Sequence, residues 1–262
     1  MMTNEAVLEV EVKLRLPGAR AYRAFLRALA AAGGEHVRTE LQVTHVLDTA
    51  ELTLASARTV LRLRESDVRG SAAAAGPGSA ACNEEGERKC VLYVKANPVL
   101  KGGISRAEEE EAVVTEEVAH KIIADPSAVA QYARRFERWG APTLPDIFPG
   151  ERDLMLTCAG RFRTVRHVIA WQGYMLEVDR VVHGDFAADP APATLWEGLD
   201  DDASDDLDGE ATVEYEIELE TPEPEAAKSV LCVGLIGGKA WCYPGIRIGF
   251  CLVFFPFRVR AF

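Results

Sequence analysis

Apolar and polar residues alternate with a period of two in several short stretches of this chain. The first is LEVEVKLRL, residues 8–16. Strict alternation of this kind is typical of a β-strand that has one apolar and one polar face. The same reasoning predicts further strands at residues 41–48, 59–64, 89–96, 106–114, 163–171, 174–182 and 212–221.

Two stretches have helical spacing instead. Apolar side chains recur every three or four residues in 19–32, which predicts an amphipathic helix that Gly33 and Gly34 are suited to end. Residues 118–139 also show a helical pattern, interrupted near Pro126. The elements are therefore mainly strands with a few helices.

Two segments interrupt the strand series, and a third follows it. Residues 70–88 are of low complexity and residues 186–211 are strongly acidic, so both are expected to form loops. Neither loop divides the strands into separate repeats. We therefore expect one mainly antiparallel β domain (α+β) over residues 1–231, followed by an atypical C-terminal tail, residues 232–262.

The polar faces of the predicted strands carry charged residues, and acids and bases are segregated among them. In VLRLR the alternation puts Arg62 and Arg64 on one face, and in YVKANP it puts Lys95 beside Asn97. In TVEYEIELE four glutamates share a face. Such neighbours are about 6 to 7 Å apart, so two like charges repel by about 2.4 kcal/mol at an effective dielectric of 20.

Two interpretations of these charged faces are open. They can be solvated outer faces of a sheet, which is the more common situation for any single strand. Alternatively, they can line a closed barrel whose apolar outside is covered by helices such as residues 19–32. The segregation of acids from bases favours the barrel, because carboxylates suit Mg²⁺ or Mn²⁺ and arginines suit phosphate oxygens.

Composition limits the possible partners. The chain has 262 residues and a net charge of -12, which argues against nucleic acid or an anionic membrane as the main partner. No stretch reaches about 18 uncharged apolar residues, the length needed to cross a bilayer. The six cysteines form no CxxC pair and no signal peptide is evident, so we expect reduced thiols and a cytoplasmic location.

Several of these segments resemble one known family. EVEVK (Glu9, Glu11, Lys13) is similar to the ExExK signature of the CYTH family, the triphosphate tunnel metalloenzymes. The later segments VLRLR, YVKANP, GISRAEEEE, TVRHV, LEVD and YEIELET resemble the plant tripolyphosphatase branch in the same order. The resemblance spans about residues 8–231, and seven ordered segments are far more specific than the first signature alone.

The resemblance implies a fold and a set of site residues. The fold would be a closed or nearly closed eight-stranded tunnel barrel with helices packed outside. The residues implied in catalysis are Glu9, Glu11, Lys13 and Lys95. Those implied in substrate binding are Lys13, Arg62, Arg64, Lys95, Arg106 and Arg166, and those implied as metal ligands are Glu9, Glu11, Glu109, Glu111, Asp179, Glu218 and Glu220.

The sequence leaves undecided which glutamates of SRAEEEE point into the barrel. The resemblance favours Glu109 and Glu111, whereas simple alternation from Arg106 would select Glu108 and Glu110 unless a β-bulge intervenes. Glu216, one step earlier in the row that contains Glu218, is a second-rank candidate. His167 is expected on the face opposite Arg166, and all five histidines of the chain are expected to have structural or surface roles.

The implied function is metal-dependent hydrolysis of inorganic tripolyphosphate, with Mg²⁺ or Mn²⁺ and two ions per site. The expected partner is a small triphosphate, and the chain is expected to be a monomer. The alternatives are a thiamine triphosphatase, a class IV adenylate cyclase, and a non-catalytic module that binds polyphosphate or nucleotides.

The chain departs from the family pattern in two places. Asn97 stands where close relatives have a base. In the tail, residues 232–262, the expected final helix and strand are absent and an irregular aromatic segment takes their place. We expect this tail either to pack irregularly against the outside of the domain or to remain poorly ordered.

Overall fold

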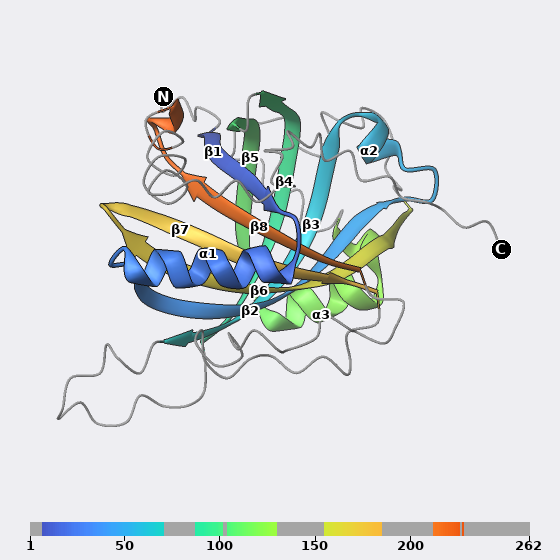
Figure 1. The fold of residues 1–262 in the computed structure, drawn as a ribbon. Coiled ribbons are helices and arrows are strands. Elements are labelled where there is room, and N and C mark those ends of the chain that lie inside the picture. The colour runs from blue at the N-terminus through green and yellow to red at the C-terminus, as the bar shows by residue number, and fades with distance from the viewer. Residues whose placement is uncertain are drawn as a thin grey trace, which may run out of the picture.

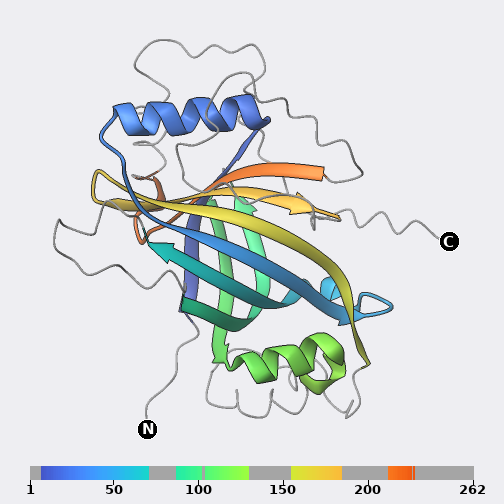
Figure 2. The same cartoon turned by 90° about the horizontal axis from the view of Figure 1, so that it is seen from below.

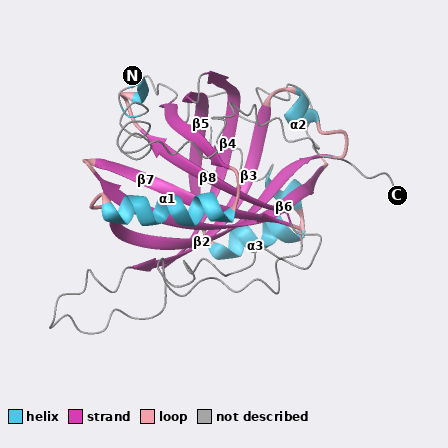
Figure 3. Ribbon diagram, viewed as in Figure 1, coloured by secondary structure: helices cyan, strands magenta, loops and turns pink. Residues whose placement is uncertain are grey.

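The computed structural model describes residues 7–70, 87–101, 104–129, 155–184, 212–225 and 227. Strands dominate this part of the chain (Figure 3). The strands are β1 (Val7–Leu16), β2 (Glu35–Thr49), β3 (Thr59–Gly70), β4 (Glu87–Lys101), β5 (Ile104–Val114), β6 (Leu156–Trp171), β7 (Tyr174–His183) and β8 (Thr212–Glu220). The helices are α1 (Ala19–Ala31), α2 (Thr53–Ser56), α3 (Glu116–Ala124) and the 3-10 turn η2 (Pro126–Ala128).

The eight strands close into a barrel in the order β1-β5-β4-β3-β2-β6-β7-β8 (Figure 1). Every neighbouring pair is antiparallel. Strand β1 closes the circle, because Glu11 lies opposite Ser105 of β5 on one side and Glu220 of β8 on the other. The fold prediction is confirmed, and the closure uses only described strands. The tail (residues 232–262) lies outside the described residues, as do the whole of the predicted loop 186–211 and residues 71–86 of the predicted loop 70–88.

The hydrophobic core lies on the outside of the barrel wall. Helices α1 and α3 cover opposite sides of the barrel (Figure 2). Under α1, Leu26 and Leu29 pack against outward-facing side chains of β1, β6, β7 and β8, among them Val12, Ile169 and Ile217. Under α2 and α3, a second cluster contains Leu47, Leu54, Leu61, Leu63, Leu92, Ile122 and Leu156. None of the described helices is both long and apolar enough to span a bilayer.

The end of α1 agrees with the sequence prediction. Gly33 has a positive φ of 83°, and the N–H of Gly34 donates to the carbonyl of Leu29 at 2.8 Å. A Cβ on Gly34 would lie 2.9 Å from that carbonyl oxygen, so a larger residue would push the helix away from the sheet. The indole N–H of Trp171 donates to the carbonyl of Ala32 at 3.2 Å and fixes the helix end to β6.

Several strands are longer than their alternation indicates. Strand β2 starts at Glu35, but a register shift between His36 and Arg38 interrupts the period of two. A second shift, between Val46 and Leu47, lies opposite the first part of β6, and residues 156–162 of β6 do not alternate in sequence. The predicted helix 118–139 begins as α3 and η2, and its residues from 130 onward lie outside the described part.

A buried histidine network lies on the outer face of the β2–β6 pair. The Thr39 hydroxyl oxygen is 3.0 Å from Nε2 of His36 and 3.0 Å from Nδ1 of His167. His167 points away from the lumen, as alternation from Arg166 predicts. Burial and the neighbouring His36 lower the pKa of His167 to about 4, so this imidazole is neutral at physiological pH.

Truncation of the outer core should destabilise the barrel. Leu29 is fully buried, so Leu29→Ala is expected to reduce the free energy of unfolding by about 2 to 5 kcal/mol. Arg27→Ala, on the exposed face of the same helix, is the control and should change it by less than about 0.5 kcal/mol. Urea denaturation measures both, and equal effects would show that α1 is not part of the core.

The His167 network should make stability depend on pH. The folded-state pKa of His167 lies below the value of 6.5 expected for the unfolded chain, so only the unfolded chain takes up this proton between those values. Stability is therefore present above pH 6.5 and is lost as pH falls toward 4, by roughly 2 kcal/mol between pH 7 and pH 5.

The variant His167→Gln should remove that part of the loss, as measured by urea denaturation at each pH. His120→Gln, at an exposed position of α3, is the control and should behave as the wild type does. If His167→Gln and the wild type lose the same stability between pH 7 and pH 5, the histidine is not the source.

Candidate active site in the barrel lumen

The charged faces of the strands point into the barrel. On β1, Val12 belongs to the apolar cluster under α1, so the residues of opposite parity, Glu11 and Lys13, face the lumen. On β8, Ile217 and Leu219 face outward in the same way, which turns the row that contains Glu218 inward. The structure therefore decides between the two interpretations: the charges line a closed barrel.

Strands β1 and β8 bring Lys13 and Glu218 into contact. Lys13 Nζ lies 2.5 Å from Glu218 Oε1 and 3.5 Å from Glu11 Oε1. Burial opposes the charge on Lys13, but Glu218, Glu11 and Glu216 outweigh it and raise the pKa of this lysine above its usual range. Lys13 is therefore a permanent cation and not a proton acceptor.

Arg166 is surrounded by three carboxylates. Its guanidinium donates from Nε and Nη2 to the two oxygens of Asp179, at 2.9 and 2.6 Å, and from Nη2 to Glu218 Oε2 at 2.9 Å. It also forms an ion pair with Glu177. Burial disfavours the charge, but Asp179 and Glu218 raise the pKa of Arg166 further above its ordinary value.

Glu177 is a lumen residue that the sequence analysis missed. Alternation in LEVD places it on the same face as Asp179, and it lies opposite Glu218 of β8. Burial, with a contribution from Glu218, raises the pKa of Glu177 to about 7 although Arg166 opposes the shift. The ion pair with Arg166 therefore offsets only part of the cost of burying this carboxylate.

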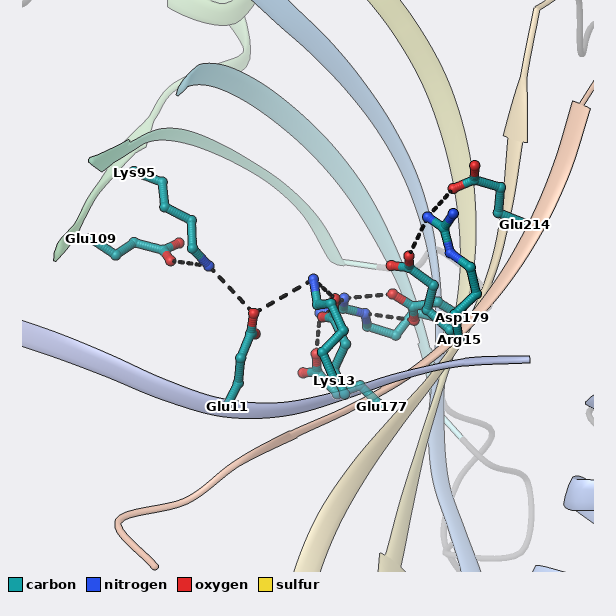
Figure 4. Close-up of polar contacts among 11 residues, drawn as sticks. Glu11, Lys13, Arg15, Lys95, Glu109, Glu177, Asp179 and Glu214 are labelled. Carbon is teal, nitrogen blue, oxygen red and sulfur yellow. Dashed lines mark hydrogen bonds and ion pairs between the residues drawn. The ribbon is translucent and has the colours of Figure 1, made fainter. Parts of the chain in front are cut away.

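Lys95 joins β4 to the acids of β5 and β1. Its ammonium lies 3.2 Å from Glu109 Oε2 and 3.7 Å from Glu11 Oε1 (Figure 4). Glu11 Oε1 is thus near two lysines, yet it is buried and accepts no hydrogen bond from any described residue. Glu11 is 5% exposed, so a carboxylate oxygen is held inside the barrel with its hydrogen-bonding capacity unused.

A second basic residue of β1, Arg15, pairs with the early part of β8. Its Nη2 lies 2.8 Å from Glu214 and 3.0 Å from Glu216. His183 of β7 lies 3.7 Å from the same Glu214 and packs against Phe162. Glu216, the second-rank candidate, therefore faces the lumen, where Arg15 neutralises it.

Arg62 and Arg64 of β3 are unlike the other lumen cations. Among the described residues, no carboxylate oxygen forms an ion pair with either guanidinium, and Nε of each is buried without a hydrogen-bond partner. Burial and the adjacent Arg64 lower the pKa of Arg62. The guanidinium of Arg64 lies over the ring of Tyr93 in a cation–π contact, and its Cζ is 4.5 Å from the ring centroid. Neither cation therefore has a carboxylate at ion-pair distance among the described residues, although the charges of Glu109, Glu218 and Glu11 attract Arg62 from further away.

The inward face of β5 is now determined. Lys95 lies opposite Glu109, and Tyr93 lies opposite Glu111, so both glutamates share the lumen face. The prediction for Arg106 as a lumen residue is wrong: it lies opposite Val10, whose side chain packs against the outer core, and it is exposed. The β-bulge lies in β4, between Ala96 and Val99, and β5 pairs with β1 without a shift. Arg106 and Glu109 therefore lie on opposite faces, so alternation misleads only when Arg106 is taken as inward.

Most of the remaining predicted residues face the lumen. Glu220 lies opposite Glu11 in the β1–β8 pair and is exposed at the end of its row. The side chains of Glu9 and Glu108 lie outside the described residues, although the backbone of Glu9 pairs with Ala107. Sequence analysis did not assign Arg15 or Tyr93 a role, although each shares the parity of an assigned residue on its own strand.

The acids of β1 and β8 suit a divalent metal by their chemistry. Mg²⁺ and Mn²⁺ prefer carboxylate oxygens, and Glu11, Glu218 and Glu220 supply them from adjacent strands, with the unused oxygen of Glu11 among them. In the described part of the chain, no three His, Cys, Asp or Glu side chains are gathered closely enough to hold an ion. The carboxylates are therefore of the kind that these metal ions prefer, but Glu11 and Glu218 form ion pairs with lysines and Arg166.

Comparisons with known proteins agree with this barrel. The family model of the CYTH domain matches residues 8–231. HpAC1 from Hippeastrum, a candidate adenylyl cyclase described by its dominant triphosphatase activity, is 29% identical, with a TM-score of 0.60 over 87% of this chain and 86% of that one.

Two further solved structures are more distant. A candidate adenylate cyclase from Bacillus halodurans is 16% identical, with a TM-score of 0.46 over 89% of this chain and 93% of that one. The PH1819 protein of Pyrococcus horikoshii is 15% identical, with a TM-score of 0.44 over 87% and 88%. No curated protein sequence matches the chain significantly.

The two kinds of lumen arginine should respond differently to removal. Arg166→Met leaves three buried carboxylates without their cation, so we expect the free energy of unfolding to fall by about 3 to 5 kcal/mol. Arg62→Met removes a buried cation that has no carboxylate at ion-pair distance among the described residues, so we expect the free energy of unfolding to stay the same or to rise. Urea denaturation compares the two variants. A large loss for Arg62→Met would show that Arg62 has a structural partner.

Proposed function

The chain belongs to the CYTH domain family, and from this premise we propose that it hydrolyses a small triphosphate, with inorganic tripolyphosphate as the substrate. One observation carries the proposal: Arg62 and Arg64 lie side by side inside a closed barrel without a carboxylate partner among the described residues. A buried cation without a counter-ion is costly, so this pair requires an anion from outside. A polyphosphate matches two adjacent guanidinium groups.

The reaction is a phosphoryl transfer to water. The oxygen of water forms a bond to a terminal phosphorus, the bond from that phosphorus to the bridging oxygen breaks, and the bridging oxygen leaves with its electron pair on diphosphate. Charge is the main obstacle, because tripolyphosphate carries about four to five negative charges that repel a nucleophile. Neutralising and positioning these charges is therefore most of the catalytic task.

The described residues divide this task between two parts of the lumen. Arg62 and Arg64 bind phosphate oxygens from β3. Lys13 and Lys95 add charge from β1 and β4, and their ammonium groups stabilise the charge that moves toward the leaving oxygen. Because the pKa of Lys13 is raised, its contribution is a fixed charge and not a proton transfer.

The acids of the lumen would hold the metal. Glu9 and Glu11 of β1, Glu218 and Glu220 of β8, and Asp179, Glu109 and Glu111 are the candidate ligands, with two ions of Mg²⁺ or Mn²⁺ expected. When bound, such ions neutralise phosphate oxygens and lower the pKa of water. The unused oxygen of Glu11 supports a role for this residue.

The relative from Hippeastrum supports hydrolysis over cyclisation, because its dominant activity is described as that of a triphosphatase. The residues give no equally direct preference among triphosphates. Thiamine triphosphate and ATP are therefore included as alternative substrates, and cyclic AMP as an alternative product. Binding of triphosphate without turnover would correspond to a non-catalytic module.

We expect the wild type to release phosphate from tripolyphosphate in Mg²⁺ or Mn²⁺ and to lose this activity in EDTA. Glu218→Gln removes a lumen carboxylate from the candidate metal site, so turnover should fall by at least about a hundredfold. Mg²⁺ alone should raise the melting temperature of the wild type and have a smaller effect on this variant. Glu117→Gln, on the exposed face of α3, is the control for the change in net charge.

The outcomes separate the candidate functions. Faster turnover of thiamine triphosphate than of tripolyphosphate would make thiamine triphosphate the preferred substrate. Formation of cyclic AMP from ATP would identify the protein as an adenylate cyclase. Thermal stabilisation by tripolyphosphate without phosphate release would indicate a binding module. Neither stabilisation nor release with any triphosphate would contradict the proposed function.

A further inference from the structure

The cations and acids assigned to two different ligands are bound to each other in the ligand-free barrel. Lys13 and Arg166 are the cations implied in phosphate binding, and Glu218 is an acid implied in metal binding. Lys13 Nζ lies 2.5 Å from Glu218 Oε1, and Arg166 Nη2 lies 2.9 Å from Glu218 Oε2. Both oxygens of this carboxylate are therefore occupied by positive charge.

Glu11 repeats this arrangement on the neighbouring strand. Its Oε1 lies between Lys13 and Lys95, at 3.5 and 3.7 Å (Figure 4). A divalent cation and these ammonium groups would compete for the same oxygens. Conversely, a phosphate group would have to compete with Glu11 and Glu218 for the lysines.

We propose that the metal and the triphosphate bind by exchanging these ion pairs: the metal takes Glu218 and Glu11, and Lys13, which loses both of its ion-pair partners among the described residues, turns to the phosphates. Lys95 and Arg166 lose one partner each but keep Glu109 and Asp179. This inference rests on the proposed function and adds how its two ligands depend on each other. The lumen then holds two classes of cation. Arg62 and Arg64 are available without metal, whereas Lys13 becomes available only when Glu11 and Glu218 are neutralised, and Lys95 and Arg166 become available only in part.

The exchange makes the two ligands cooperative. Each ligand removes the competitor of the other, so the metal should raise the affinity for triphosphate, and triphosphate should raise the affinity for metal by the same factor. The same reasoning makes one substitution increase affinity. Removing the charge of Glu218 has part of the effect of metal binding, because Lys13 and Nη2 of Arg166 then no longer form ion pairs with this side chain.

The test measures tripolyphosphate binding in EDTA by isothermal titration calorimetry, without metal and without turnover. We expect Glu218→Gln to bind at least about tenfold more tightly than the wild type, because one competing charge is removed near the ligand. Glu220→Gln is the matched control: it removes the same charge from the same strand face, but among the described residues Glu220 forms no ion pair with Lys13 or Arg166. Glu220→Gln should increase the affinity for tripolyphosphate by a clearly smaller factor than Glu218→Gln does.

A second measurement approaches the exchange from the metal side. Lys13→Met removes a competitor of the metal, so Mn²⁺ without phosphate should bind this variant at least about fivefold more tightly than the wild type. Lys121→Met, on exposed α3, controls for net charge. This arm keeps the proposal testable if Glu218→Gln does not fold.

Unchanged or weaker tripolyphosphate binding by folded Glu218→Gln, or equal gains in Glu218→Gln and Glu220→Gln, would overturn the exchange. Unchanged Mn²⁺ affinity in Lys13→Met would overturn it as well. These results do not depend on hydrolysis. A wild type that hydrolyses tripolyphosphate in Mg²⁺ while Glu218→Gln gains no affinity would leave the proposed function intact and remove only the exchange.

Discussion

A charge inside a closed barrel must be balanced by an opposite charge, because the wall removes most of the water that would otherwise screen it. This constraint organises the lumen of the protein. Lys13 is balanced by Glu218, Lys95 by Glu109, and Arg166 by three carboxylates at once. Arg62 and Arg64 on β3 are the exception among the described residues: no carboxylate lies within ion-pair distance of either, and this is the feature that favours an anionic ligand.

The charged lumen also decides where the apolar core lies. Since the inner face of each strand carries charge, the outer face carries the leucines, isoleucines and valines, and these need a cover. Helix α1 supplies it on one side and α3 with α2 on the other. The barrel wall is therefore held from outside, so that substitutions in the lumen can alter charge without removing the packing that maintains the fold.

Much of this arrangement could be predicted from the sequence, because a period of two assigns each residue of a regular strand to one face. The alternation in residues 8–16 and 212–221 placed Glu11, Lys13 and Glu218 on the charged face together. Alternation fails where the backbone is irregular, and the shift near His36 hides the start of β2. The misplacement of Arg106 has another cause: the resemblance implies an inward face, whereas alternation from Glu109 along the regular strand β5 turns it outward. Ion pairs between strands distant in sequence, such as Lys13 of β1 with Glu218 of β8, depend on strand order, which alternation does not reveal.

The most direct test of the central claim is a crystal structure of the protein with Mn²⁺ and an imido-bridged tripolyphosphate analogue that resists hydrolysis. The account predicts phosphate oxygens in contact with the guanidinium groups of Arg62 and Arg64 inside the barrel. It also predicts an anomalous Mn²⁺ peak beside Glu218, with Lys13 moved from that carboxylate toward the phosphates. An analogue bound outside the barrel, or a lumen whose Arg62 and Arg64 contact no ligand, would contradict it.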